Sequence, residues 1–197
     1  MRWFEGDPHF GHKRICTLAG RPFTDVTHMN ETIVANWNSV VSPEDSGFIL
    51  GDIALGSIME SLEYVGHLKG DLYMEWGNHD RCFPGSKKSA GITPEEWVGI
   101  YMGAGFVSVR ASERLMLGDT EVNLSHFPYA GDHTAEDRWA DHRLVDDGTI
   151  LLHGHTHSKK KISRSPAGTL QIHVGVDAWN FFPASEEEIL ALIEAES

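Results

Sequence analysis

The chain has 197 residues, enough for one well-buried core but short for two independent domains, so we expect a single domain over residues 1–197. Hydrophobic residues make up 41% and charged residues 23%, as in soluble globular proteins, and no apolar run approaches the ~20 residues of a membrane span. The net charge of −13 argues against stable binding to duplex nucleic acid, because it repels polyanions, but it still allows a small phosphorylated ligand.

The N-terminus has no basic segment followed by an apolar stretch, so no signal peptide is predicted. Cys16 and Cys82 are too few for a disulfide framework or a cysteine-rich zinc site, and we expect both to be reduced thiols. Together these features predict a cytoplasmic protein that does not associate with membranes.

The first half of the chain alternates strand-like apolar segments with helical patterns, which predicts parallel βαβ units. Strands are expected at residues 2–6, 47–50 and 72–76, and helices at residues 25–40, 57–68 and 93–102. Thr24 or Asp25 is a suitable N-cap for the first helix. Ser57 and Glu60 fit a capping box for the second helix, and Thr93 begins a strong helix-start sequence for the third.

The second half is richer in strands and ends in a helix. Strands are expected at residues 106–109, 114–117, 122–124, 150–152 and 170–176, and a helix at residues 185–196. Segments 106–109 and 114–117 fit a hairpin. The overall pattern predicts an α/β protein in which two mixed sheets pack face to face with helices outside, a four-layer α/β/β/α sandwich.

Side chains that bind metals follow several of these strands directly. Carboxylate, imidazole and amide oxygen ligands suit hard or borderline divalent ions. The carboxyl ends of strands are also where a sheet presents its loops to a ligand. In each i, i+2 pair, the two side chains of an extended segment point to one side. The motifs are Asp7-x-His9, Gly51-Asp52, Gly77-Asn78-His79-Asp80, Ser125-His126 and His155-x-His157.

Each of these residues also has an ordinary structural interpretation. Asp52 could cap the turn after Gly51, and Asn78 could be a turn residue. His126, taken alone, is better explained as a hydrogen-bonded core histidine. The metal interpretation therefore depends on the whole set occurring together and in order.

The ordered set resembles the calcineurin-like metallophosphoesterase superfamily over residues 7–157, and the opening sequence DPHFGH resembles a small bacterial and phage branch of it. The resemblance implies a metallophosphoesterase-like fold and two divalent ions. Manganese is the expected metal, with iron, zinc, cobalt and nickel as alternatives. The ligands it implies are Asp7, His9 and His157 for one ion, Asn78, His126 and His155 for the other, and Asp52 as the bridge.

The resemblance also implies hydrolysis of a small phosphodiester or phosphomonoester by a metal-bound hydroxide. His79 would assist the leaving group, and Asp80 would hold the other ring nitrogen of His79, although Asp80 could also serve as a loop-capping carboxylate. The compact, acidic chain favours a nucleotide-like substrate, with cyclic nucleotides as one option. A nuclease acting on nucleic acid ends and a non-catalytic scaffold are the alternatives.

Several residues around the motifs are candidates for binding substrate. His12 and Arg81 each follow a ligand motif, and Tyr129 and His133 lie in the long segment after His126. For each of them a surface or structural role fits as well. The lysines at 159–161 could contact a phosphate, although a charge run is more often a solvated turn.

Overall fold

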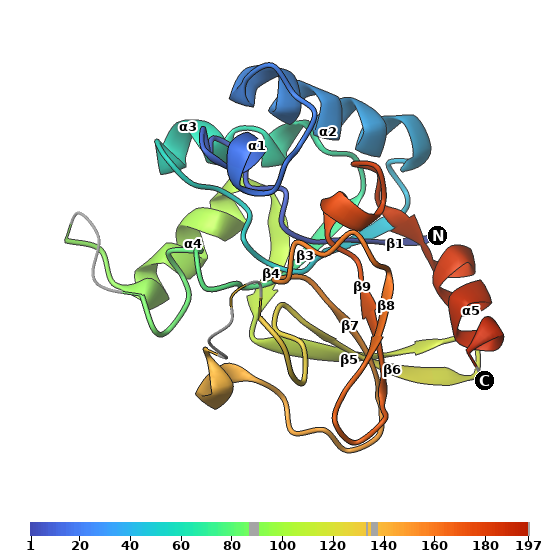
Figure 1. Ribbon diagram of the computed structural model, residues 1–197. Coiled ribbons are helices and arrows are strands. Elements are labelled where there is room, and N and C mark those ends of the chain that lie inside the picture. The colour runs from blue at the N-terminus through green and yellow to red at the C-terminus, as the bar shows by residue number, and fades with distance from the viewer. Residues whose placement is uncertain (87–90, 133, 135–137, 197) are drawn as a thin grey trace.

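The computed structural model describes residues 1–86, 91–132, 134 and 138–196 (Figure 1). One five-stranded mixed sheet has the order β10-β1-β2-β3-β4, in which β1 to β4 run parallel and β10 pairs antiparallel with β1. Its strands are β1 (Arg2–Glu5), β2 (Ser46–Ile49), β3 (Asp71–Glu75), β4 (Phe106–Arg110) and β10 (Ala184–Ser185).

A second five-stranded mixed sheet has the order β5-β6-β7-β9-β8. Its three middle strands β6, β7 and β9 run parallel, and both edge strands are antiparallel to their neighbours. The strands are β5 (Ser112–Leu117), β6 (Thr120–Ser125), β7 (Ile150–His153), β8 (Ile162–Arg164) and β9 (Leu170–His173). The predicted α/β protein with two mixed sheets is confirmed.

Five α-helices lie in the part of the chain that the structure describes, and none of them is long and apolar enough to cross a membrane. They are α1 (Ile15–Leu18), α2 (Val26–Val40), α3 (Ile58–Leu62), α4 (Pro94–Ala104) and α5 (Glu186–Ala195), accompanied by 3-10 helices at Val65–His67, Ala140–His142 and Val176–Ala178. Asp25 caps α2 as predicted, and Thr93 forms a capping box with Glu96 at the start of α4.

Two apolar cores explain how the layers hold together. The first core lies between the first sheet and the helices α2, α3 and α4, and it includes Trp37, Ile49 and Met74. The second core fills the space between the two sheets, where Phe4 and Leu124 are fully buried, and α5 packs against the same core. Burying side chains of this size contributes about 1.5–3 kcal/mol each, so the two cores fix how the two sheets face one another.

The outer face of the second sheet differs from the prediction of a fourth, helical layer. Among the described residues, an irregular segment covers this face. Tyr129 from that segment donates its backbone N–H to Gln171 Oε1 at 2.7 Å, and its hydroxyl accepts from Asn123 Nδ2 at 2.9 Å. Asn123 and Gln171 are buried strand residues of the second sheet, so these bonds satisfy polar groups that an apolar helix would leave unpaired.

Two local predictions were wrong. The segments predicted as a hairpin are β4 and β5, and they belong to different sheets. β4 pairs with β3 in the first sheet, and β5 pairs with β6 in the second. The helix predicted at residues 57–68 is broken into α3 and a 3-10 turn, and Ser57 makes no side-chain cap. Both errors concern pairing or continuity that depends on distant contacts and not on local sequence.

The carboxyl ends of the parallel strands of both sheets meet at one place. Gly6, which follows β1, forms a parallel bridge with Gly175, which follows β9, and Gly6 O accepts the Val176 N–H at 3.0 Å. Gly154, which follows β7, also lies close to these loops. A Cβ at this position would lie 2.7 Å from Asp7 Oδ2 and 2.9 Å from Leu50 O, so the close approach requires glycine. Residues that follow strands in either sheet are therefore brought into a single cluster.

Glu75 at the end of β3 is a buried carboxyl group with a predictable effect on stability. Burial raises its pKa from 4.5 to about 8, and among the described residues neither carboxylate oxygen has a hydrogen-bond partner. Because the folded state holds this proton more tightly than the unfolded state, stability should fall as the pH rises from about 4.5 to about 8. The loss is roughly 5 kcal/mol, at 1.36 kcal/mol for each pKa unit.

Urea unfolding of the metal-free protein at several pH values tests this expectation. Glu75→Gln should remove the part of the loss that Glu75 contributes, so that the variant gains stability over the wild type above pH 8, whereas buried Glu5, whose pKa burial also raises to about 8, should keep its own contribution. Glu44→Gln, at an exposed position, is the control and should leave the pH dependence unchanged. Parallel curves for the wild type and Glu75→Gln would show that Glu75 does not carry the effect.

Candidate metal centre

Asp52, in the loop after β2, lies at the middle of the cluster and faces two sets of ligand-type side chains. Its Oδ2 is 3.6 Å from His9 Nε2, and its Oδ1 is 3.7 Å from His126 Nε2. The Asp52 side chain is almost completely buried. The two oxygens of one carboxylate thus point toward histidines that follow β1 in one sheet and β6 in the other, which is the arrangement needed to bridge two ions.

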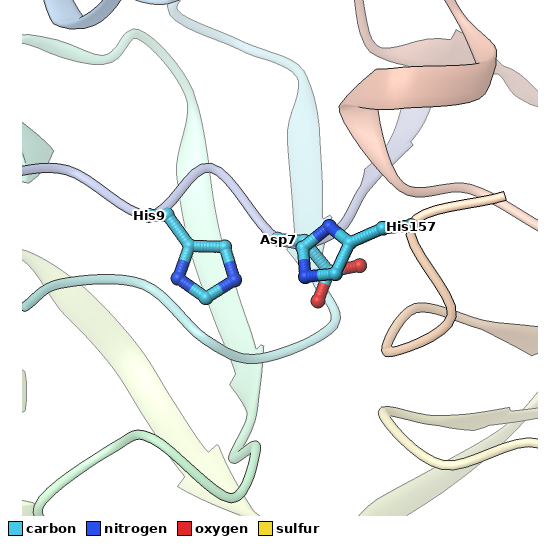
Figure 2. Close-up of side chains that lie close together, drawn as sticks. All are labelled: Asp7, His9 and His157. Atoms are coloured by element: carbon cyan, nitrogen blue, oxygen red, sulfur yellow. The ribbon is translucent and has the colours of Figure 1, made fainter. Parts of the chain in front are cut away.

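The first set consists of Asp7, His9 and His157, whose ligand atoms lie within 4.8 Å of one another. Figure 2 shows that Asp7 and His9 come from one loop, while His157 reaches them from a different segment of the chain. The rings of His9 and His157 are 5.0 Å apart, centroid to centroid. Both ring nitrogens of His9 are buried and have no hydrogen-bond partner among the described residues, which a bound cation would correct.

The second set consists of Asn78, His126 and His155. His126 Nδ1 lies 2.9 Å from the Leu50 carbonyl oxygen, which can only accept, so this nitrogen carries the proton of the neutral ring. His126 Nε2 then presents a lone pair, and it lies 3.2 Å from Asn78 Oδ1 and 3.2 Å from His155 Nδ1. Acceptor atoms that converge in this way repel one another unless a cation lies between them.

The backbone at the candidate ligands is strained. Eight non-glycine residues in the described part of the chain have a positive φ, and five of them are candidate ligands. The left-handed conformation costs a non-glycine residue on the order of 1–3 kcal/mol, and such residues concentrate at functional sites. The five are Asp7 (55°), His9 (54°), Asp52 (54°), His155 (68°) and His157 (49°).

Buried carboxylates behind two of the histidines fix the orientation of their rings. Asp177 Oδ2 lies 2.9 Å from His157 Nδ1, and the same carboxylate accepts two hydrogen bonds of 2.9 Å from Arg21. This contact places the proton on His157 Nδ1 and directs the lone pair of Nε2 away from Asp177. The bond to Asp177 and the nearby charge of Asp7 raise the pKa of His157, although burial opposes the rise.

Asp132 has the corresponding position behind His155. Its Oδ1 is 3.3 Å from His155 Nε2, and Arg138 donates to both of its carboxylate oxygens at 3.1 Å. The sequence patterns did not identify Asp132, Asp177 or Arg21. Asp177 and Arg21 do stand at the start of DAWNFFP and RPF, but neither segment reveals a partner about 150 residues away.

Asp177→Asn should weaken metal binding by about 10–100-fold, the usual effect of removing an outer partner of a ligating histidine. The amide keeps the shape of the side chain but no longer offers two acceptors to His157 and Arg21. Calorimetric titration of the metal-free protein with Mn²⁺ measures the effect, and Asp141→Asn, at an exposed position, is the control. Unchanged Mn²⁺ affinity in Asp177→Asn would show that Asp177 only stabilises the fold.

Asp7 lies against a further histidine, His173, whose Nε2 is 3.9 Å from Asp7 Oδ2. Burial raises the pKa of Asp7, but its interaction with His173 and the charges of His157, His126 and His9 hold that pKa well below its usual range. The Arg21 side chain also donates to the Asp7 carbonyl oxygen at 2.8 Å. Asp7 is therefore ionised, and Arg21 holds its backbone while the surrounding histidines hold its carboxylate.

Asp80 has the loop-capping role that the sequence offered as the alternative, and not the predicted contact with the His79 ring. Its Oδ2 accepts the backbone N–H groups of Asp52 and Gly77, both at 2.8 Å, and its Oδ1 accepts that of Ile53 at 2.9 Å. Burial and the charge of Asp52 raise the pKa of Asp80 to about 7. Among the described residues no hydrogen bond joins Asp80 to the His79 ring, because the carboxylate turns inward and ties together the loops after β2 and β3.

His79 lies at the surface of the cluster. Its backbone N–H donates to Asp52 Oδ1 at 2.8 Å, while its side chain is exposed. The His79 ring is 5.7 Å from the ring of His9, centroid to centroid. The imidazole is therefore held beside the candidate ligands and remains accessible to a bound molecule.

The other predicted substrate contacts separate into two groups. The His12 ring is 5.3 Å from that of His9, and Arg81 Nε is buried without a hydrogen-bond partner among the described residues, so both stay candidates.

The other candidates lie elsewhere or serve the fold. Tyr129 has a structural role, because its hydroxyl donates to the Thr149 carbonyl oxygen at 2.9 Å. Lys161 packs its Nζ 3.4 Å from the centroid of the Trp179 ring, while Lys159 and Lys160 are exposed. His133 lies outside the described residues.

No protein-family model matches the chain. The Gene 66 protein of Mycobacterium phage L5 is 40% identical over 199 residues, which cover 97% of this chain and 93% of the relative. The chain belongs to the family of this Gene 66 protein. The Gene 66 protein of Mycobacterium phage D29 is also 40% identical, over 187 residues that cover 90% of this chain and 88% of that relative.

The fold of this chain is shared by a solved structure. A protein of unknown function, AQ665 from Aquifex aeolicus, aligns with a TM-score of 0.70 and 23% identity over 98% of each chain. A structure of an archaeal phosphodiesterase aligns with a TM-score of 0.45 and 11% identity, over 88% of this chain and 82% of the other, a level of likeness from which neither fold nor function is inferred.

Proposed function

We propose that the chain is a dinuclear metal-dependent phosphoesterase that hydrolyses small phosphodiesters, with a calcineurin-like metallophosphoesterase arrangement of ligands. The observation that carries the proposal is the position of Asp52, which turns one oxygen toward His9 and the other toward His126. Asp52 also accepts the His79 backbone N–H, but that bond alone does not account for a carboxylate that faces an imidazole nitrogen with each oxygen, whereas a bridging ligand requires this geometry.

By the sequence resemblance, the remaining donors would divide between two ion positions. Asp7, His9 and His157 would hold one ion, and Asn78, His126 and His155 the other, with Asp52 shared. The resemblance implies Mn²⁺, and the mixture of carboxylate, imidazole and amide oxygen also accepts iron, zinc, cobalt or nickel. When bound, two such ions activate a water molecule and neutralise the oxygens of a phosphoryl group.

The protein's own contribution to the reaction is orientation and proton transfer. Asp132 and Asp177 hold the rings of His155 and His157 with a nitrogen lone pair directed at the cluster. The exposed imidazole of His79 stands beside the cluster, where it can donate a proton to the leaving oxygen of an ester. Asp80 supports this arrangement indirectly by fixing the loops that carry Asp52 and His79.

A screen with added Mn²⁺ tests the proposal. The substrates are bis(4-nitrophenyl) phosphate, 4-nitrophenyl phosphate, and 2′,3′- and 3′,5′-cyclic nucleotides, with the metal-free protein as the control. We expect turnover of the diester that depends on added metal and disappears with a chelator. If the protein neither binds metal nor turns over any of these esters, the proposal is wrong and a non-catalytic role is favoured.

A further inference from the structure

A groove of about 730 Å³ opens beside the candidate metal centre, between the segment after His9 and the helices α2 and α3. Figure 1 shows α1, α2 and α3 gathered on one side of the molecule. His12 lines the groove, and its ring lies 5.3 Å from the His9 ring, centroid to centroid, so one end of the groove lies near the metal centre. His12 Nδ1 is buried without a hydrogen-bond partner among the described residues, which leaves a polar atom for a ligand at this inner end.

The loops after β1 and β2 are hydrogen-bonded to each other beside this groove. Leu55 N–H donates to the Phe10 carbonyl oxygen at 2.8 Å, and Phe10 also forms a bridge with Ala54. Gly11 and Gly56 line the groove with φ values of 76° and 73°, and a Cβ on Gly11 would lie 1.9 Å from Ser61 Oγ. Such close backbone packing leaves little room for movement, so the groove is preformed and would cost a ligand little ordering energy.

The side chains of the groove combine an aromatic surface with charges of both signs. Tyr64 lines the groove and is stacked on Phe10, at 5.4 Å between ring centroids and 17° between ring planes. A tyrosine ring held in this way can stack with a planar base. Lys13 and Arg14, which follow His12 in the sequence, also line the groove and suit an anionic phosphoryl group.

The α3 side of the groove carries two carboxylates, Glu60 and Glu63. Carboxylates accept hydrogen bonds from hydroxyl and amino groups but repel further phosphates. The chain's net charge of −13 acts in the same direction. The groove therefore suits an uncharged, polar group with an aromatic ring and opposes a strand of nucleic acid.

We propose that this groove binds the nucleoside substituent of a phosphodiester whose phosphoryl group lies at the metal centre. The inference rests on the proposed phosphoesterase function and adds to it the class of substrate and the place where that substrate is recognised. Its volume lies within the roughly 300–1,000 Å³ of small-molecule sites, which accommodates one nucleoside. Selectivity for nucleotide esters is thus located in the groove, and the metal centre alone would not distinguish them.

Two esters with the same leaving group test the inference in the Mn²⁺-loaded protein: thymidine 5′-(4-nitrophenyl) phosphate and bis(4-nitrophenyl) phosphate. Thr27→Trp on α2 and Ser57→Trp before α3 fill the groove from opposite walls, and both positions are exposed. Each variant should lower kcat/KM for the thymidine ester by about 10–100-fold, as when a base loses its stacking surface, mainly through KM. Turnover of bis(4-nitrophenyl) phosphate should stay within about twofold, since the chemistry is unchanged.

Ala35→Trp, an exposed position on the same helix but outside the groove, is the matched control and should leave both esters unaffected. Equal effects of Thr27→Trp and Ser57→Trp on the two esters, or no effect on either, would overturn the inference. Absence of turnover for both esters would instead reject the proposed function. In that case calorimetric binding of thymidine 5′-monophosphate still tests the groove, because binding that Thr27→Trp and Ser57→Trp leave unchanged would overturn it.

Discussion

Replacing Asp52 by asparagine should abolish metal-dependent hydrolysis and reduce the bound metal from two ions to one or fewer. The loss in kcat/KM should exceed the about 10–100-fold change that outer partners of metal ligands produce. Asparagine offers one oxygen and no charge, so it cannot replace a carboxylate whose two oxygens face His9 and His126. Metal content by mass spectrometry, together with turnover of bis(4-nitrophenyl) phosphate, measures both effects.

The same substitution should not harm folding of the metal-free protein. The charge of Asp52 raises the pKa of buried Asp80, so removing that charge relieves a repulsion between two buried carboxylates. Thermal unfolding without metal should therefore be unchanged or slightly higher, and Asp119→Asn, at an exposed position, should change neither activity nor metal content. An Asp52→Asn protein that still binds two ions and remains active would disprove the bridging role.

The sequence was informative about the candidate ligands because each of their motifs lies within a few residues of the end of a strand. A strand can be recognised from its local apolar pattern, and parallel strands present their carboxyl ends together. Asp7 after β1, Asp52 after β2 and His126 after β6 follow this rule. Their convergence could therefore be predicted although they lie far apart in the chain.

Features that depend on side-chain direction could not be predicted in the same way. Asp80 belongs to the most specific motif, yet the turn after β3 points its carboxylate at the backbone N–H groups of Asp52, Ile53 and Gly77. The pattern of residue types alone equally allowed a contact with His79. Only the geometry of the turn distinguishes the two roles.

Partners supplied from distant segments were also invisible in the sequence. Asp177 and Arg21 are separated by 156 positions, and nothing in either segment indicates the pairing. The division of β4 and β5 between two sheets is another non-local feature, since one intervening residue, Ala111, separates the two strands. Local patterns thus predicted the ligand motifs at the strand ends, whereas the supporting contacts required the folded arrangement.

His79→Ala should lower the turnover of a diester with a poor leaving group by about 10²–10⁴-fold, the usual contribution of a positioned acid. A cyclic nucleotide is such a diester, because its leaving alkoxide needs a proton. The exposed His79 ring lies beside His9, and the backbone N–H of His79 is held by Asp52, so its imidazole is placed at the edge of the cluster. Turnover of bis(4-nitrophenyl) phosphate should fall much less, since nitrophenolate leaves without protonation.

The contrast between the two esters separates an acid from a metal ligand. If His79 acts on the leaving oxygen, metal content should stay unchanged in His79→Ala, and the loss should grow with the pKa of the leaving alcohol. His28→Ala, at an exposed position on α2, should leave both esters unaffected. An equal loss on both esters would instead indicate a contact with the phosphoryl group, and full activity on the cyclic nucleotide would show that protonation of the leaving oxygen does not depend on His79.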